Sequence, residues 1–153
     1  MKKIKIIGCG NLLAYDEGIG IHIVRRLHNE ILPENVEVKE LRTPGQLLVE
    51  LLSGADKLII IDACSSGQCK SGTVNRYCGG DSSLEKMLAN TIHAHNFYPI
   101  FKLRKKVSPH KMPEEMVVIS VEIEDRQKFC VGLSKSVFAS IDDVVKAVIN
   151  ELY

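Results

Sequence analysis

The sequence predicts an α/β fold: a three-layer α/β/α sandwich with a mostly parallel, twisted sheet, formed by a single domain over residues 1–153. Apolar strand-like segments alternate with amphipathic helical segments along the chain, which is the pattern of βαβ units. Residues 58–61 are four consecutive aliphatic residues, typical of a parallel strand covered on both faces. The length of 153 residues suits one hydrophobic core and is too short for two.

The first half of the chain carries clear strand and helix signals. Ile19, Ile23 and Leu27 recur at the spacing of one helix face, so this helix should pack on the sheet. The expected elements are, in order, a strand at residues 3–8, this helix, an edge strand at 36–41, a short helix at 46–52 and a central strand at 57–63.

The second half opens with a stretch rich in Ser, Gly and Cys at residues 65–80 and then returns to regular elements. They are a strand-like patch at 73–77, a helical turn within 82–90, a helix at 96–105, a buried strand at 116–123 and a closing helix with apolar positions from 137 to 152. Ser134 or Ser136 is the expected cap of this closing helix.

Composition argues against several classes of partner. The net charge of +1 gives no basic surface for nucleic acid, and no stretch reaches the roughly 20 apolar residues of a membrane span. The N-terminus lacks the apolar core of a signal peptide. Five cysteines without disulfide spacing indicate reduced thiols. These observations predict a cytoplasmic protein.

Candidate functional residues follow the predicted strands, because ligands of open α/β sheets bind at the carboxyl ends of the strands. The first strand runs into a glycine turn that resembles a dinucleotide-binding loop. However, Leu13 stands where the third glycine is needed, and the acidic pair Asp16-Glu17 at the helix start would repel a phosphate. A nucleotide site is therefore excluded.

Carboxylates at this edge of the sheet favour a divalent cation. Asp62 ends the central strand and brings a second carboxylate near Glu17, and two such groups repel unless a positive charge lies between them. His93 and His95 offer imidazole, the usual complement in a transition-metal site. Taken singly, each residue also has an ordinary role, as a helix-start charge, a loop cap or a structural histidine, and the pattern alone leaves both interpretations open.

The motifs resemble those of the hydrogenase maturation endopeptidases, the nickel-dependent, aspartate-rich family that processes the large subunit of [NiFe] hydrogenases. The matching motifs occur in family order over essentially the whole chain. They are Gly8-Cys9-Gly10-Asn11, Asp16-Glu17-Gly18-Ile19-Gly20, Thr43-Pro44-Gly45, Ile60-Ile61-Asp62-Ala63, a histidine before a helix, and Gly132-Leu133-Ser134.

The resemblance implies that Glu17, Asp62 and His95 are the catalytic, metal-binding residues. His95 is selected because Asn96 and a helix follow it, as they follow the family ligand, whereas His93 is an additional histidine. By the same resemblance, Glu40, Thr43 and Gly45 bind the substrate. Leu41 and Arg42 depart from the small residues usual in that segment.

The implied reaction is one endoproteolytic cut that removes the C-terminal extension of a [NiFe] hydrogenase large-subunit precursor after nickel insertion. The implied metal is nickel carried by the precursor, and cadmium or zinc could occupy the same site. Two other functions stay open. One is a non-catalytic checkpoint or chaperone that binds the immature large subunit. The other is a stand-alone metallohydrolase with its own zinc.

Overall fold

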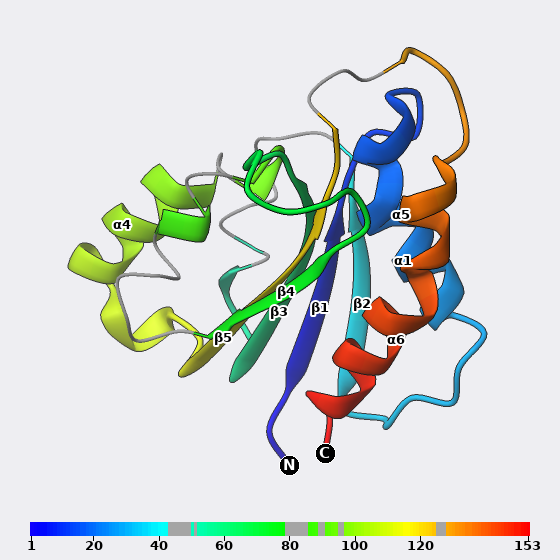
Figure 1. Ribbon diagram of the computed structural model, residues 1–153. Coiled ribbons are helices and arrows are strands. Elements are labelled where there is room, and N and C mark those ends of the chain that lie inside the picture. Colours follow the sequence, from blue (N-terminus) through cyan, green and yellow to red (C-terminus); the bar gives the residue numbers. More distant parts are fainter. Residues whose placement is uncertain (43–49, 51, 79–85, 89–90, 95–96, 125–127) are drawn as a thin grey trace.

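A single five-stranded sheet organises the computed structural model, which describes residues 1–42, 50, 52–78, 86–88, 91–94, 97–124 and 128–153 (Figure 1). The strand order is β2-β1-β3-β5-β4. The strands are β1 (Ile4–Cys9), β2 (Val36–Leu41), β3 (Lys57–Cys64), β4 (Val74–Cys78) and β5 (Glu115–Glu122). All neighbours run parallel except β4, which pairs antiparallel with β5.

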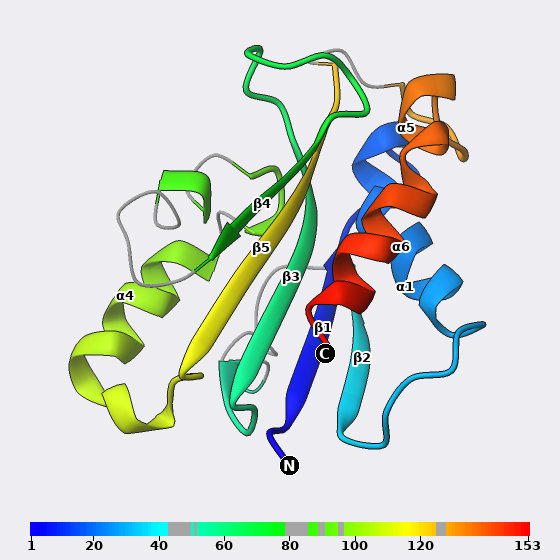
Figure 2. The same cartoon turned by 60° about the horizontal axis from the view of Figure 1, so that its bottom comes forward.

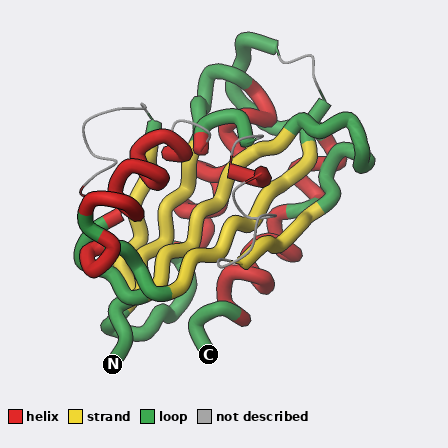
Figure 3. The backbone as a smooth tube through the Cα atoms, turned by 90° about the vertical axis from the view of Figure 1, so that its left-hand side faces the viewer, coloured by secondary structure: helices red, strands yellow, loops and turns green. Residues whose placement is uncertain are grey.

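The burial of each strand follows its place in the sheet. β3 pairs with β1 on one side and β5 on the other, and all eight of its residues are buried. β2 is an edge strand in which less and more exposed residues alternate, as the sequence predicts. Figure 2 and Figure 3 show the twist that this order of strands produces.

Helices cover both faces of the sheet. They are η1 (Tyr15–Gly18), α1 (Ile19–Leu27), α4 (Phe97–Val107), η3 (Pro109–Lys111), α5 (Lys135–Ala139) and α6 (Ile141–Asn150). Helices α1, α5 and α6 lie on one face and α4 on the other (Figure 1). Ile59 and Ile61 of β3 pack toward the first group, whereas Leu58 and Ile60 share a core with Phe101 of α4. The predicted three-layer α/β/α sandwich is confirmed.

The sheet is mostly parallel, as predicted, and β4, the counterpart of the strand-like patch at 73–77, is its antiparallel member. One detail differs from the prediction. The single closing helix is two helices separated at Ser140, whose hydroxyl donates to the carbonyl oxygen of Val137 at 2.6 Å. A serine that bonds back to a preceding carbonyl competes with the regular helix pattern, which accounts for the break.

Some predicted elements lie partly outside the described residues. Of the expected helix at 46–52, only Glu50 and Leu52 are described, and both are helical. Of residues 82–90, only 86–88 are described, and they form a helical turn. No helix among the described residues is long and apolar enough to cross a membrane.

Candidate functional site

Three titratable side chains meet at the carboxyl ends of β1 and β3. Glu17 lies in η1, which follows β1, and Asp62 lies near the end of β3. His93 belongs to a short segment that is attached to the same strand: Thr91 forms an isolated bridge with Cys64, and the amide of Ile92 donates to the carbonyl oxygen of Ala63 at 3.0 Å. Glu17 and Asp62 therefore lie on the sheet edge where the sequence predicts them.

Asp62 is a fully buried carboxylate with four hydrogen-bond donors around it. Its Oδ1 accepts from the amide of Ala63 and from Nδ1 of His93, each at 2.8 Å. Its Oδ2 accepts from the amides of His93 and Ala94, at 2.7 and 2.6 Å. Charge-assisted hydrogen bonds of this kind satisfy a buried carboxylate, so Asp62 fixes both the backbone and the ring of His93.

The ring of His93 lies between the two acidic side chains. Nδ1 is hydrogen-bonded to Oδ1 of Asp62 at 2.8 Å, and Nε2 lies 3.8 Å from Oε1 of Glu17. Burial lowers the pKa of His93, but the hydrogen bond to Asp62 and the charges of Asp62 and Glu17 outweigh it and raise the pKa above 6.5. The side chains of His93 and Glu17 are 19% and 24% exposed, so both can be reached from solvent.

Glu17 and His93 lie at a separation that two ligands of one metal ion could have. Two ligand atoms that each lie about 2.1 Å from a four-coordinate metal are roughly 3.4 Å apart, and the observed separation of 3.8 Å is close to this value. A histidine whose second nitrogen is held by a carboxylate is the common arrangement at metal sites. Among the described residues, no group of three or more His, Cys, Asp or Glu side chains is arranged to hold a metal.

The other predicted site residues are only partly described. His95, Thr43 and Gly45 lie outside the described residues, so their predicted roles stay predictions. Glu40 is the next-to-last residue of β2 and pairs with Gly8 of β1. Its carboxylate is paired with Arg25 at 3.2 Å and with Arg42 at 2.7 Å.

These ion pairs decide the charge state of Glu40. Burial raises the pKa of this carboxyl, and the hydrogen bonds and charges of Arg42 and Arg25 lower it by more, so the pKa is below its usual value. The positive charge of Arg42 thus balances the negative charge of Glu40, a residue that the resemblance assigns to substrate binding. A substrate group that binds Glu40 would have to displace or share a guanidinium.

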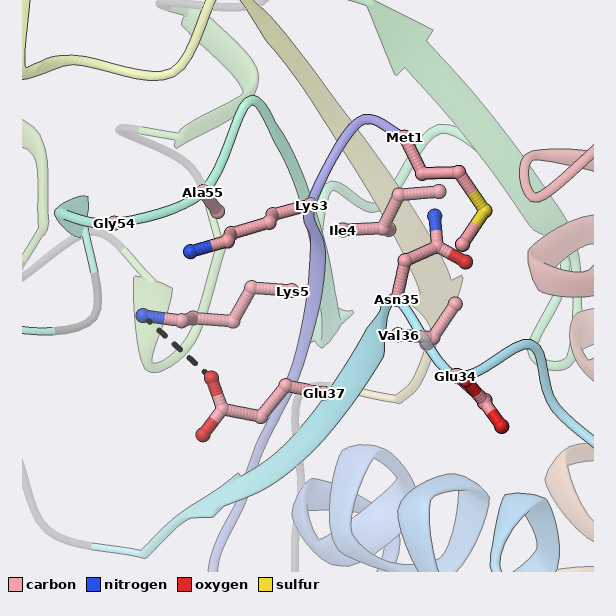
Figure 4. A pocket seen from close by; sticks show the side chains of 10 residues that line it. All are labelled: Met1, Lys3, Ile4, Lys5, Glu34, Asn35, Val36, Glu37, Gly54 and Ala55. Carbon is pink, nitrogen blue, oxygen red and sulfur yellow. Dashed lines mark ion pairs between the residues drawn. The ribbon is translucent and has the colours of Figure 1, made fainter.

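Two cavities lie at opposite ends of the sheet. One, of about 390 Å³, adjoins the site and is lined by Cys64, Tyr77 and Glu122 among others. The other, of about 430 Å³, is formed at the amino ends of β1 and β2, where Lys5 and Glu37 pair across it (Figure 4). Because parallel sheets place their chemistry at the carboxyl ends, the cavity beside Cys64 is the relevant one.

The cysteines at this edge are not nucleophiles. Cys9 and Cys64 are buried, and neither forms a disulfide. Burial, with a smaller contribution from the charge of Asp62, raises the pKa of Cys9 well above its usual value. Burial, followed by the charge of Glu122, raises the pKa of Cys64 to about 11. Both are therefore thiols at neutral pH, whereas a nucleophilic cysteine is a thiolate.

Sequence reasoning missed two features of the site. The contact of His93 with Asp62 and Glu17 depends on the isolated bridge that sets the register of residues 91–94, and a single bridge leaves no periodic pattern in a sequence. The second feature is a contact between Asp16 and Ser134. Ser134 holds the expected cap position of α5, but its hydroxyl donates to Asp16 and not to the helix.

Comparison with known proteins identifies the family of this chain. The model of the hydrogenase maturation protease family matches residues 21–151. The hydrogenase 2 maturation protease of Escherichia coli K12 is 29% identical over 151 residues, which are 98% of this chain and 90% of the relative.

Solved structures give the same relationship. The hydrogenase maturating endopeptidase HybD from E. coli superimposes with a TM-score of 0.86 at 28% identity, covering 98% of this chain and 91% of that one. The [NiFe] hydrogenase maturation protease HybD from Thermococcus kodakarensis shares the fold, with a TM-score of 0.80 at 23% identity and 99% of both chains covered. The expected enzyme class, an endopeptidase, is confirmed, and the chain belongs to the hydrogenase maturation protease family.

Proposed function

We propose that this chain is a nickel-dependent endopeptidase that removes the C-terminal extension of a [NiFe] hydrogenase large-subunit precursor in the cytoplasm, after nickel insertion. Membership of the maturation protease family supports the reaction class. The observation that carries the proposal is the ring of His93, which is held by Asp62 and directed toward Glu17 at the open edge of the sheet.

In this proposal, nickel arrives as part of the substrate. Glu17 and Nε2 of His93 engage the nickel that the precursor already holds, and Asp62 keeps His93 in the tautomer with a free Nε2 lone pair. Nickel then supplies Lewis-acid polarisation of the scissile carbonyl or of a water molecule. The protein contributes orientation and negative charge, and needs neither a serine nor a cysteine nucleophile.

The histidine proposed here is His93, whereas the resemblance to the family selects His95. Two observations favour His93. Its ring donates to Asp62 at 2.8 Å, and its backbone amide donates to the same carboxylate at 2.7 Å. This double attachment fixes the ring without help from a ligand, and such preorganisation reduces the cost of binding. The set of Glu17, Asp62 and His95 is the competing prediction that the experiment below tests.

The test is a cleavage assay on a hydrogenase large-subunit precursor with and without nickel, read by mass spectrometry of the precursor's C-terminus. We expect the wild-type chain to shorten the precursor only when nickel is present. Glu17→Gln, Asp62→Asn and His93→Ala should each lower the rate about 100-fold, the scale found for metal ligands and the groups that orient them. His95→Ala and His110→Ala should keep most of the wild-type rate. His110 is an exposed histidine in η3, which precedes the amino end of β5, and the candidate site lies at the carboxyl ends of the strands.

Each alternative has its own outcome. Loss of activity in His95→Ala, with activity kept in His93→Ala, would restore the set with His95. Nickel-dependent binding of the precursor without a cut would overturn the enzyme assignment for that client in favour of a checkpoint or chaperone. Cleavage without nickel by a protein that purifies with zinc would indicate a stand-alone metallohydrolase.

A further inference from the structure

The turn that presents Glu17 has a strained backbone. Tyr15 has a φ of +52°, and it is the one residue other than glycine with a positive φ in the described part of the chain. A side chain with a Cβ disfavours this region, and tyrosine lacks the short polar side chain that eases it for asparagine. Such a conformation persists only where surrounding contacts enforce it, and it is concentrated at functional sites.

The contacts that enforce this turn come from one distant segment, residues 128–134. The amide of Tyr15 donates to the carbonyl oxygen of Cys130 at 3.0 Å, and Nζ of Lys128 lies 5.8 Å from the centre of the Tyr15 ring. Asp16 receives two further bonds from Ser134: the amide donates to Oδ1 and the hydroxyl to Oδ2, both at 2.7 Å. Figure 1 shows this segment, which leads into α5, beside the turn.

Asp16 is well placed to transmit this restraint. It is only 2% exposed and precedes Glu17 directly. Glu17 itself bonds locally within the turn: its amide donates to the carbonyl oxygen of Ala14, and its carbonyl oxygen accepts from the amide of Asn11. Charge-assisted bonds such as those from Ser134 are about twice as strong as neutral ones, so the pair Asp16–Ser134 is the firmest restraint that this segment places on the turn.

We infer that Asp16 is a positioning residue, which with Ser134 holds the strained turn so that Glu17 faces His93. The inference rests on the proposed function for its consequence in catalysis, because it concerns the carboxylate proposed to engage nickel. Without the pair, Tyr15 relaxes toward a negative φ and the carboxylate of Glu17 leaves its place 3.8 Å from Nε2 of His93. Both carboxylate oxygens of Asp16 accept from Ser134, so Asp16 acts on the site through its neighbour Glu17.

The experiment compares two serines of the same region. Ser134→Ala removes the hydroxyl bond to Asp16, whereas the control Ser140→Ala removes a hydroxyl bond of similar length to Val137 that does not involve the turn. Asp16→Ala is the obvious variant but could fail to fold, so Ser134→Ala is the main test. Ser134→Thr keeps a hydroxyl and is the rescue. The readouts are the crystal structure of each variant, the melting temperature, and kcat and KM on the nickel-loaded precursor.

We expect Ser134→Ala to displace Glu17 from His93 and to lower kcat about tenfold with KM changed less than about twofold, the size of one lost bond to a charged group. Ser134→Thr should restore the position of Glu17 and the value of kcat. Ser140→Ala should lower the melting temperature but leave the position of Glu17 and kcat unchanged. An unchanged Glu17 and unchanged kcat in Ser134→Ala would overturn the inference. Failure of the wild-type chain to cut the precursor would contradict the proposed function. The crystal structures alone would then decide whether the pair Asp16–Ser134 holds Glu17 in place.

Discussion

At the residue scale, the ring of His93 lies between two carboxylates that differ in burial and in hydrogen bonding. Asp62 is buried and bonded to four donors, so its charge is fixed in place. Glu17 is partly exposed and lies 3.8 Å from the other ring nitrogen. Asp62 therefore determines the orientation of the ring, and Nε2 faces the carboxylate of Glu17. The raised pKa of His93 is the electrostatic result of both.

This pKa predicts opposite pH dependences for activity and stability. A proton competes with nickel for Nε2, so the cleavage rate should fall as the pH drops through the raised pKa, which lies above 6.5. The folded pKa exceeds the unfolded one, so the stabilisation from protonated His93 is complete below about pH 6.5 and is lost as the pH rises through the folded pKa. A pH–rate profile and urea unfolding across this range measure the two effects.

The matched control for the pH experiment is His93→Gln, which cannot titrate. Its free energy of unfolding should lose the part of the pH dependence that belongs to His93 in the wild type. The same slope in both proteins between about pH 6 and 8 would contradict the assignment, because linkage ties that slope to the group that changes its proton occupancy.

At the element scale, the sequence predicts those helices and strands whose buried residues recur at a regular spacing. The apolar run of β3 and the stripe of α1 are visible because each face repeats along the chain. The direction of β4 depends on its pairing with β5, the break after α5 on one local bond of Ser140, and the attachment of residues 91–94 on one isolated bridge to β3. None of these features leaves a periodic pattern along the chain. The same distinction explains why Asp62 and Glu17 were predicted and the contact of His93 with them was not.

Close packing of α1 on the sheet depends on two glycines of the predicted motifs. A Cβ on Gly20 would lie 2.1 Å from the carbonyl oxygen of Cys9 and 2.7 Å from that of Ile61. A Cβ on Gly8 would lie 2.2 Å from the carbonyl oxygen of Gly20. These are backbone atoms of the strands and helix that carry the site, so they cannot move aside as a flexible side chain would.

Gly20→Ala should therefore push α1 away from β1 and β3. Overpacking of a core costs about 1–3 kcal/mol, and a contact with rigid backbone belongs at the upper end of that range. Urea unfolding measures the loss. His28→Ala, at the exposed end of the same helix, is the control and should change stability by less than about 0.5 kcal/mol. Equal losses in both variants would show that the close approach is not the cause.

At the scale of the whole molecule, one charged cluster joins the end of the chain to the sheet. Glu151 follows α6, and its carboxylate pairs with Nζ of Lys57 at 2.8 Å and with Arg76 of β4. Nζ of Lys57 also donates to the backbone carbonyl oxygen of Glu151 at 2.9 Å and pairs with Glu115 at 3.0 Å. The cluster thus connects α6 with three strands at the amino end of β3, away from the candidate site.

Glu151→Gln should destabilise the whole fold without changing the chemistry at the site. The side chains of Glu151 and Lys57 are only 8% and 11% exposed, and removing one partner of a buried pair costs about 3–5 kcal/mol, because the other charge stays buried. The exposed side chain of Arg76, at 47%, lets water replace part of the loss, so we expect about 2–3 kcal/mol in urea unfolding.

The control for this cluster is Glu114→Gln, which breaks the pair of Glu114 with Lys2. Those side chains are 75% and 65% exposed, and such surface pairs contribute about 0–1 kcal/mol. The lowered pKa of Glu151, caused mainly by its hydrogen bond to Arg76, adds a second check. The stabilisation from Glu151 should be complete above the usual carboxyl pKa and be lost as the pH falls through the lowered one. If Glu151→Gln and Glu114→Gln cost the same, or if the acid sensitivity is unchanged in Glu151→Gln, the cluster does not secure α6 to the sheet.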